Sequence, residues 1–173
     1  MFFKLLGGIL VIFSCSAIGF YVAASYNYRL KTLKNLQIAL AMLETEINYS
    51  LSPLPEALKN TAKKIEKDVS DLFEKTASYL SGGEGYTAGE AWEMALSNLS
   101  QNACLRDNDL EILSAFGQYL GITDRDDQIK NIKLTRDLLK QQEVLALEEK
   151  KKNEKVCRYL GVLTGIMVFL LLY

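Results

Sequence analysis

Hydrophobic residues recur at helical spacing along most of this chain. Intervals of three and four residues separate Leu33, Leu36, Leu40, Leu43 and Ile47, which predicts a long helix with one apolar face. No segment alternates apolar and polar residues between turn signals, as the strands of a half-buried sheet would. The sequence therefore predicts an all-α fold.

Four shorter amphipathic segments follow this first helix. We expect one of them from about Pro53 to Lys67, because a proline is tolerated in the first turn of a helix. The next should begin at a cap near Asp68 or Ser70 and end at Gly82. Both segments carry an apolar face, so they are expected to pack together in a helical bundle.

Two further segments begin at capping patterns. Thr87 and Glu90 have the spacing of a capping box, in which each side chain bonds to the backbone of the other residue. Trp92 lies in phase with the apolar face of that helix and is predicted to anchor the core. Residues 107–109 supply caps for the next helix. A last helix begins at about Asp124, and no glycine or proline interrupts it before the C-terminal stretch. The bundle is therefore expected to contain about six helices.

Two stretches without charge stand at the ends of the chain, at residues 5–24 and 159–173. A helix needs about twenty apolar residues to cross a bilayer, and Val156 and Cys157 bring the second stretch near that length. The sequence predicts a transmembrane helix at each end, continuous with the first and last helices of the bundle. Cleavage of the first stretch as a signal peptide or lipoprotein leader is the alternative. The predicted division is an N-terminal transmembrane helix at residues 1–27, a cytosolic helical domain at residues 28–155 and a C-terminal transmembrane helix at residues 156–173.

Basic residues lie beside both uncharged stretches. Three follow the first stretch within residues 29–34, and four lysines precede the second within residues 150–155. The tendency of basic residues to stay on the cytoplasmic side of a bilayer predicts a cytoplasmic middle region between the two spans, with both termini across the membrane. Gly161 and Gly165 stand four residues apart, and they are candidates for close packing against another membrane helix.

The composition argues against several classes of function. The 173 residues contain no histidine and only 3 cysteines, which are scattered along the chain. We therefore expect no catalytic residue, no metal site and no cofactor. The glycines at residues 82–85 lack the Lys-Ser/Thr of a phosphate-binding loop. The 20 basic residues form no groove with interleaved aromatic residues, so we expect no nucleic-acid binding. A protein of this composition is expected to act through an interface rather than as an enzyme.

Acidic residues near a sharp corner and at helix starts form the candidate partner surface. Pro53 and Pro55 separate the first long helix from the next one, because the residue before a proline avoids helical geometry. Gathered carboxylates would attract a basic partner. The alternative is that they are ordinary first-turn acids, each of which stabilises its own helix. The candidate residues are Glu44, Glu46, Pro53, Pro55, Glu56, Glu90, Glu93, Asp107 and Asp109.

Several short motifs occur in the order typical of one bacterial family. The motifs are Leu-Glu-Thr-Glu-Ile-Asn-Tyr at residues 43–49, Pro-Leu-Pro-Glu-Ala-Leu at 53–58, Gly-Glu-Ala-Trp at 89–92, Asp-x-x-Ile-Leu-x-x-Phe-Gly-x-x-Leu-Gly at 109–121 and Leu-Gly-x-Leu-x-Gly at 160–165. With these motifs the chain resembles the stage III sporulation protein AB family of endospore-forming bacteria. That family is in turn distantly similar to the cytoplasmic helical domain of type II secretion F proteins.

The resemblance implies a place in the channel-like complex that is assembled between the mother cell and the forespore. The chain would be a non-enzymatic membrane scaffold on the mother-cell side of the outer forespore membrane. Its implied partners are a cytoplasmic ATPase similar to stage III sporulation protein AA, other membrane components of the complex and a further copy of itself. The alternative function is a small membrane-anchored helical regulator that binds a ligand or a signalling partner.

Overall fold

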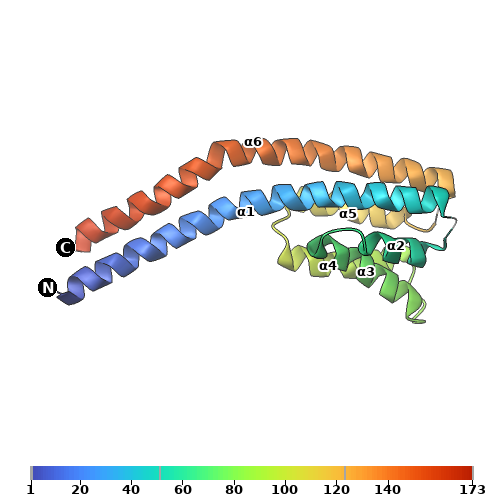
Figure 1. Ribbon diagram of the computed structural model, residues 1–173, viewed down its shortest axis with the longest axis horizontal. Helices are drawn as coiled ribbons and strands as arrows, with labels where there is room; N and C mark the ends of the chain where they lie inside the picture. Colours follow the sequence, from blue (N-terminus) through green and yellow to red (C-terminus); the bar gives the residue numbers. More distant parts are fainter. Residues whose placement is uncertain (1, 51, 123, 173) are drawn as a thin grey trace. The chain divides into compact units, whose positions relative to one another are not determined.

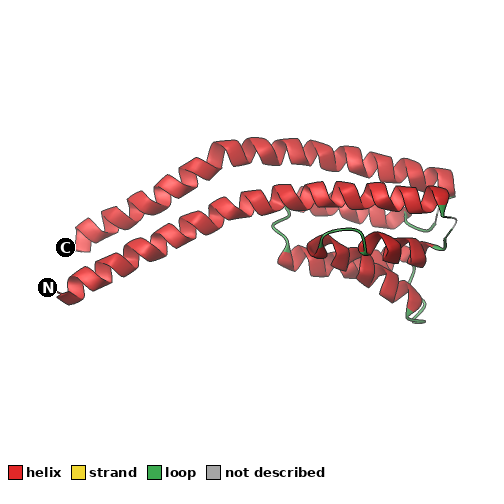
Figure 2. Cartoon of the chain, viewed as in Figure 1, coloured by secondary structure: helices red, strands yellow, loops and turns green. Residues whose placement is uncertain are grey.

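The protein is represented by a computed structural model that describes residues 2–50, 52–122 and 124–172. Within these ranges the chain consists of helices joined by loops, and no strand is present (Figure 2). The helices of the described residues are α1 (Phe2–Tyr49), α2 (Leu54–Ala62), α3 (Lys67–Ser81), α4 (Ala88–Asn102), α5 (Asp107–Tyr119) and α6 (Arg125–Leu172) (Figure 1). The predicted all-α fold of about six helices is confirmed.

The transmembrane part of the fold prediction is wrong. Among the residues that the structure describes, no helix contains a stretch long and apolar enough to cross a bilayer. What the structure does show at both ends is helical continuity, since α1 and α6 are each an unbroken helix of 48 residues. The predicted spans at residues 1–27 and 156–173 rested on the absence of charge, which is one feature of a spanning helix and does not establish a span by itself. Gly161 and Gly165, the candidates for membrane packing, belong to the residues whose surroundings are not described.

The chain divides into two compact units. One comprises Met1–Tyr28 together with Leu145–Tyr173. The other, which we call the head, comprises Arg29–Val144. The head contains the C-terminal part of α1, the whole of α2 to α5 and the N-terminal part of α6.

Trp92 lies at the centre of the head and is fully buried. Its indole packs edge-on against Phe73 of α3 and Phe116 of α5, at ring-centroid distances of 5.5 and 5.0 Å. The indole N–H donates to the backbone carbonyl of Leu113 at 2.8 Å, so the polar atom of this side chain is also satisfied. The predicted role of Trp92 as a core anchor is confirmed.

The predicted apolar helix faces form the rest of the core. Each helix of the head directs its stripe of residues at spacings of three and four toward the interior, and this burial is the main source of its stability. The buried residues on these faces include Leu33, Leu36, Leu40, Leu43, Leu58, Val69, Leu72, Phe73, Leu113, Phe116, Ile132 and Leu139.

The turn between α2 and α3 differs from the sequence prediction. The helix expected to reach Lys67 ends at Ala62, and α3 begins at Lys67 without a side-chain cap, so the predicted caps at Asp68 or Ser70 are also wrong. Ser70 instead donates its hydroxyl to the carbonyl of Ala62 at 2.8 Å, which satisfies a carbonyl left open at the end of α2. No glycine or proline marks this turn, so its position is set by tertiary contacts.

The capping box at the start of α4 is confirmed. The backbone N–H of Thr87 donates to the Glu90 carboxylate at 2.8 Å, and the backbone N–H of Glu90 donates to the Thr87 hydroxyl at 3.3 Å. These bonds satisfy two amides that a helix start leaves open. The pKa of Glu90 is lowered because the backbone N–H and the hydroxyl of Thr87 both donate to its charged carboxylate.

Candidate functional site

A groove of about 570 Å³ runs between α4 and α5 on the head. The short loop at residues 103–106 joins the two helices, so they form an antiparallel pair. Ten residues line the groove, and most of them are polar, acidic or small: Glu93, Leu96, Ser97, Ser100, Asp107, Leu110, Glu111, Ser114, Ala115 and Gln118.

The spacing of these residues shows how the groove arises. On α4 the lining begins at Glu93 and continues three, four and seven residues later. On α5 it begins at Asp107 and continues three, four, seven, eight and eleven residues later. Such spacings place side chains on a single face of a helix. Each helix therefore has one face toward the core and another face that lines the groove.

The floor of the groove is apolar, and its rim is acidic. Leu96 is only 4% exposed at the floor, and Leu110 is half-buried beside it. The carboxylates of Glu93, Asp107 and Glu111 are exposed around this floor, and no lining residue is basic. An apolar floor with an acidic rim favours a ligand that combines apolar and positively charged groups.

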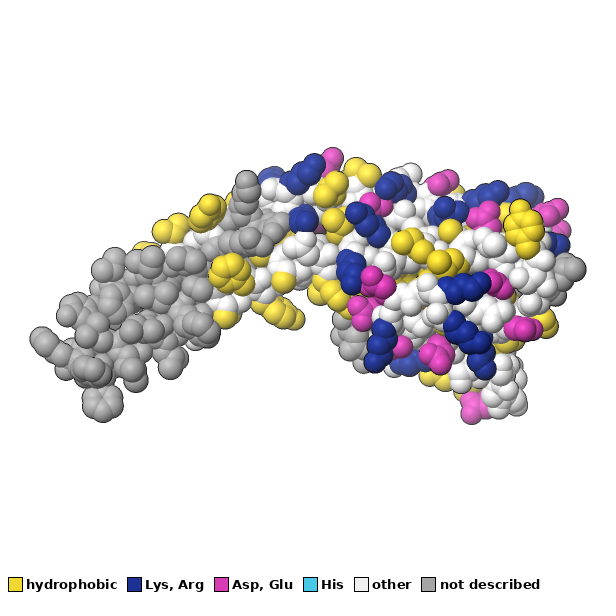
Figure 3. All heavy atoms as spheres, viewed as in Figure 1, with side chains coloured by type: hydrophobic (Ala, Val, Ile, Leu, Met, Phe, Trp, Pro, Cys, Tyr) yellow, Lys and Arg dark blue, Asp and Glu magenta, His cyan; other side chains and the backbone are white. Residues whose placement is uncertain are grey.

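The α4–α5 pair differs in charge from the rest of the head. Residues 88–119 contain five acidic residues and a single basic one, Arg106. On the face of the molecule seen in Figure 3, by contrast, lysine and arginine side chains are interspersed with aspartate and glutamate. Outside residues 88–119 the head contains 13 acidic and 13 basic residues, so its excess of negative charge comes from the two helices that form the groove.

Two glycines allow α4 and α5 to approach each other closely. A Cβ atom at Gly89 would lie 3.1 Å from the backbone oxygen of Gly117. A Cβ atom at Gly117 would lie 2.4 Å from Cδ1 of Trp92, which is too close for any side chain. On the groove side, Ser114 of α5 donates a hydrogen bond to the carboxylate of Glu93 on α4. These contacts hold the two helices in one fixed arrangement, so the groove is preformed.

The structure places Glu93 and Asp107 in this groove, and they are the candidates from the sequence that it brings together. The sequence prediction missed Glu111, Leu96 and Leu110. The available signal was the second stripe of small and polar residues at helical spacing on α4 and α5. That stripe is hard to distinguish in a sequence from an ordinary solvent-exposed face.

Asp109 differs from Asp107 in its environment. Asp107 is exposed, whereas Asp109 is fully buried. It accepts two hydrogen bonds from Arg29 of α1, at 2.8 and 3.0 Å, and one from the backbone N–H of Arg106 at 2.9 Å. A carboxylate with these partners holds α1 and α5 together and is not displayed to another protein.

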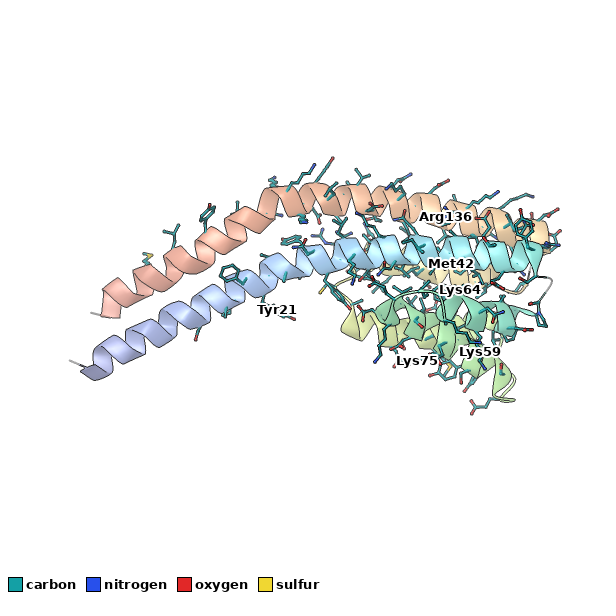
Figure 4. The ribbon with its side chains drawn as sticks, viewed as in Figure 1. Tyr21, Met42, Lys59, Lys64, Lys75 and Arg136 are labelled. Atoms are coloured by element: carbon teal, nitrogen blue, oxygen red, sulfur yellow. The ribbon has the colours of Figure 1, made fainter. Side chains whose placement is uncertain are left out.

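Glu44 and Glu46 also interact within the head. Glu44 forms ion pairs with Arg136 at 2.9 Å and Lys133 at 3.6 Å, both on α6. Glu46 pairs with Lys64 on the other side of α1 at 2.6 Å. Positions two residues apart on a helix differ by about 200° around its axis, so Glu44 reaches α6 while Glu46 reaches the turn after α2. Figure 4 labels Arg136 of α6 and Lys64, which lies in the turn between α2 and α3.

Glu46 is the more buried of these two acids, with 8% exposure. Its carboxylate also accepts hydrogen bonds from Ser50 at 3.0 Å and Asn60 at 3.5 Å. The hydrogen bond from Lys64 is the main cause that lowers the pKa of Glu46, and it outweighs the opposing effect of burial. Glu46 therefore fixes the end of α1 against α2.

The remaining candidates lie around the corner before α2 and at the start of α4. Pro53 occupies the N-cap position of α2, Pro55 lies in its first turn, and Glu56 is exposed beside them. The prediction that a proline opens this helix is confirmed. Glu90 is held in its capping box. None of these four residues lines the groove.

No set of three or more histidine, cysteine, aspartate or glutamate residues could hold a metal ion among the residues described. Cys104 is a free, exposed thiol in the loop between α4 and α5.

Comparison with known proteins finds one family over nearly the whole chain. The family model described as stage III sporulation protein AB matches residues 4–173. A stage III sporulation protein AB from Bacillus subtilis (strain 168) is 37% identical over 169 residues, which is 98% of this chain and 98% of that protein. A solved structure of stage III sporulation protein AB (SpoIIIAB) matches with a TM-score of 0.67 and 34% sequence identity, covering 72% of this chain and 98% of that chain.

Proposed function

The chain belongs to the stage III sporulation protein AB family, and we propose that it is a non-enzymatic scaffold of the complex that connects mother cell and forespore. In this role it binds a cytoplasmic ATPase similar to stage III sporulation protein AA. It couples that ATPase to the other components on the mother-cell side of the outer forespore membrane. The head would correspond to a single copy of the cytoplasmic domain of type II secretion F proteins.

The groove between α4 and α5 is the observation that carries this proposal. A scaffold needs a rigid, displayed surface, and the paired glycines and Trp92 give the groove a fixed shape. Its three acidic residues are exposed, whereas Glu44, Glu46 and Asp109 form ion pairs inside the head. Exposed charges of one sign speed the encounter with a partner of opposite sign.

The same groove could serve a ligand-binding regulator, because its volume falls within the range of about 300–1,000 Å³ that is usual for small-molecule sites. Such sites enclose most of the ligand surface. Here six of the ten lining residues are exposed, so a small ligand would remain largely in solvent. A protein partner, which supplies its own covering surface, fits this open geometry better.

Co-purification from sporulating cells tests the proposed function. We expect the full-length chain to retain the ATPase, and a Glu93→Lys/Asp107→Lys variant to lose it because the rim of the groove becomes basic. Glu74→Lys is the matched control, since Glu74 is exposed on α3 and does not line the groove. Equal recovery of the ATPase with wild type and the groove variant would refute the proposed use of this surface.

A further inference from the structure

The occupant of the groove can be specified further, on the premise that the proposed function holds. We propose that the α4–α5 groove binds one basic amphipathic α-helix of a partner protein, which completes a layer of three helices. The lining residues support this occupant through their spacing, their sizes and their charges.

The spacing of the lining residues fits a helix. Both α4 and α5 present residues at i, i+3, i+4 and i+7 to the groove, which is the pattern that a helix shows toward a packed neighbour. The lining of α5 from Asp107 to Gln118 extends for about 16 Å at 1.5 Å per residue. The matching segment of a bound helix is therefore about three turns long.

The sizes of the lining residues indicate where the apolar side chains of that helix lie. Ser97, Ser100, Ser114 and Ala115 are small and leave the space between the two helices open. Leu96 and Leu110 provide apolar contacts at the floor. Large apolar residues of the incoming helix would fill this space, as in other complexes in which a helix lies in a groove.

The charges of the rim indicate what flanks those apolar residues. Asp107 and Glu111 lie on α5, and Glu93, whose carboxylate also accepts a hydrogen bond from Ser114, lies on α4, so both sides of the groove carry carboxylates. Lysine or arginine next to the apolar face would pair with them. The described part of the head has no strand edge to which an extended peptide could add, so strand addition is not available.

Peptide binding to the purified full-length protein tests this inference. The probe is a fluorescent 14-residue peptide with leucine at positions i, i+3, i+4 and i+7 and lysine beside them. The control peptide has the same composition in scrambled order, which keeps the charge and removes the apolar face. Fluorescence anisotropy should show binding of the patterned peptide about tenfold or more tighter than binding of the scrambled one.

Two variants test charge and shape separately. Glu111→Lys should weaken binding of the patterned peptide about tenfold by reversing a rim charge. Ala115→Phe should weaken it to a similar extent by filling the groove without a change of charge. Glu74→Lys on α3 should bind as wild type does, and Trp92 fluorescence checks that each variant is folded.

The results separate this inference from the proposed function. Equal binding of the two peptides, or normal binding by Ala115→Phe, would overturn the helical occupant and leave the co-purification result intact. Loss of peptide binding in a groove variant that still retains the ATPase would support the helix and overturn the proposed ATPase contact. Self-association of the chain through the groove, seen as a second copy that competes with the peptide, would overturn the assignment to a partner protein.

Discussion

Arg29 on α1 and Asp109 on α5 form a bidentate ion pair inside the head, with Nε 2.8 Å from Oδ2 and Nη2 3.0 Å from Oδ1. Arg29 is 5% exposed and Asp109 is fully buried. Arg29→Met would leave a buried carboxylate without its main counter-charge, so we expect it to lower the free energy of unfolding by about 3–5 kcal/mol. Urea unfolding followed by Trp92 fluorescence measures the loss.

The control for this prediction is an exposed ion pair on the same helix. Lys31 pairs with Glu66 at 2.6 Å, and about half of each side chain is open to solvent. We expect Lys31→Met to change stability far less than Arg29→Met does, because solvent already screens the exposed pair. Equal losses of unfolding free energy in the two variants would show that burial does not strengthen the contribution of the Arg29–Asp109 pair.

Gly117→Ala should destabilise the head. The added methyl group would lie 2.4 Å from Cδ1 of Trp92, and the indole is confined by Phe73 and Phe116. Overpacking of this kind costs about 1–3 kcal/mol, which thermal unfolding would show as a lower Tm. Gln118→Ala, at the next and exposed position, should unfold close to the wild-type temperature. An unchanged Tm for Gly117→Ala would mean that the indole can move aside.

Thr87→Ala should weaken the start of α4. The substitution removes the hydroxyl that accepts the backbone N–H of Glu90, at a cost of about 1 kcal/mol. Thr87→Ser keeps that oxygen and serves as the matched variant. Guanidinium unfolding of the two variants should place the serine form near wild type, and the prediction fails if both lose the same stability.

The contribution of Glu46 should depend on pH. Its pKa is lowered in the folded state, mainly by the hydrogen bond from Lys64, so its stabilising effect is complete above the unfolded-state pKa of about 4.3. The effect is lost as pH falls through the folded-state pKa. We therefore expect Glu46→Gln to be less stable than wild type near neutral pH and the difference to shrink below about pH 4. Glu56→Gln, at an exposed position of α2, is the control, and a pH-independent difference for Glu46→Gln would refute the assignment.

A fragment of residues 28–155 should fold without the rest of the chain. It contains the whole head, Arg29–Val144, whose helices bury their apolar faces against one another. Far-UV circular dichroism should show a helical spectrum and a cooperative thermal transition. A disordered spectrum would show that the head depends on the other unit.

Much of the candidate site follows from tertiary structure rather than from local sequence. Glu93 and Asp107 could be selected as exposed acids at or near helix starts, and both line the groove. Glu111 and the floor at Leu96 could not be selected with them, because residues on α4 and α5 become neighbours only when the antiparallel pair forms. The close contact of Gly117 with Trp92, which sets the spacing of that pair, is likewise a contact between separate helices.

The sequence by itself determined the helices, their apolar faces, the Thr87–Glu90 capping box and the central position of Trp92. These features depend on periodicity and on contacts within four residues, which a sequence displays directly. Only the tertiary structure decided which group each charged side chain contacts. Asp109 meets Arg29, Glu46 meets Lys64, and Glu44 meets Arg136 at separations of 80, 18 and 92 residues. An acid on a helix has the same local sequence whether it faces solvent or a counter-charge, so the packing of distant helices determines which carboxylates remain free for a partner.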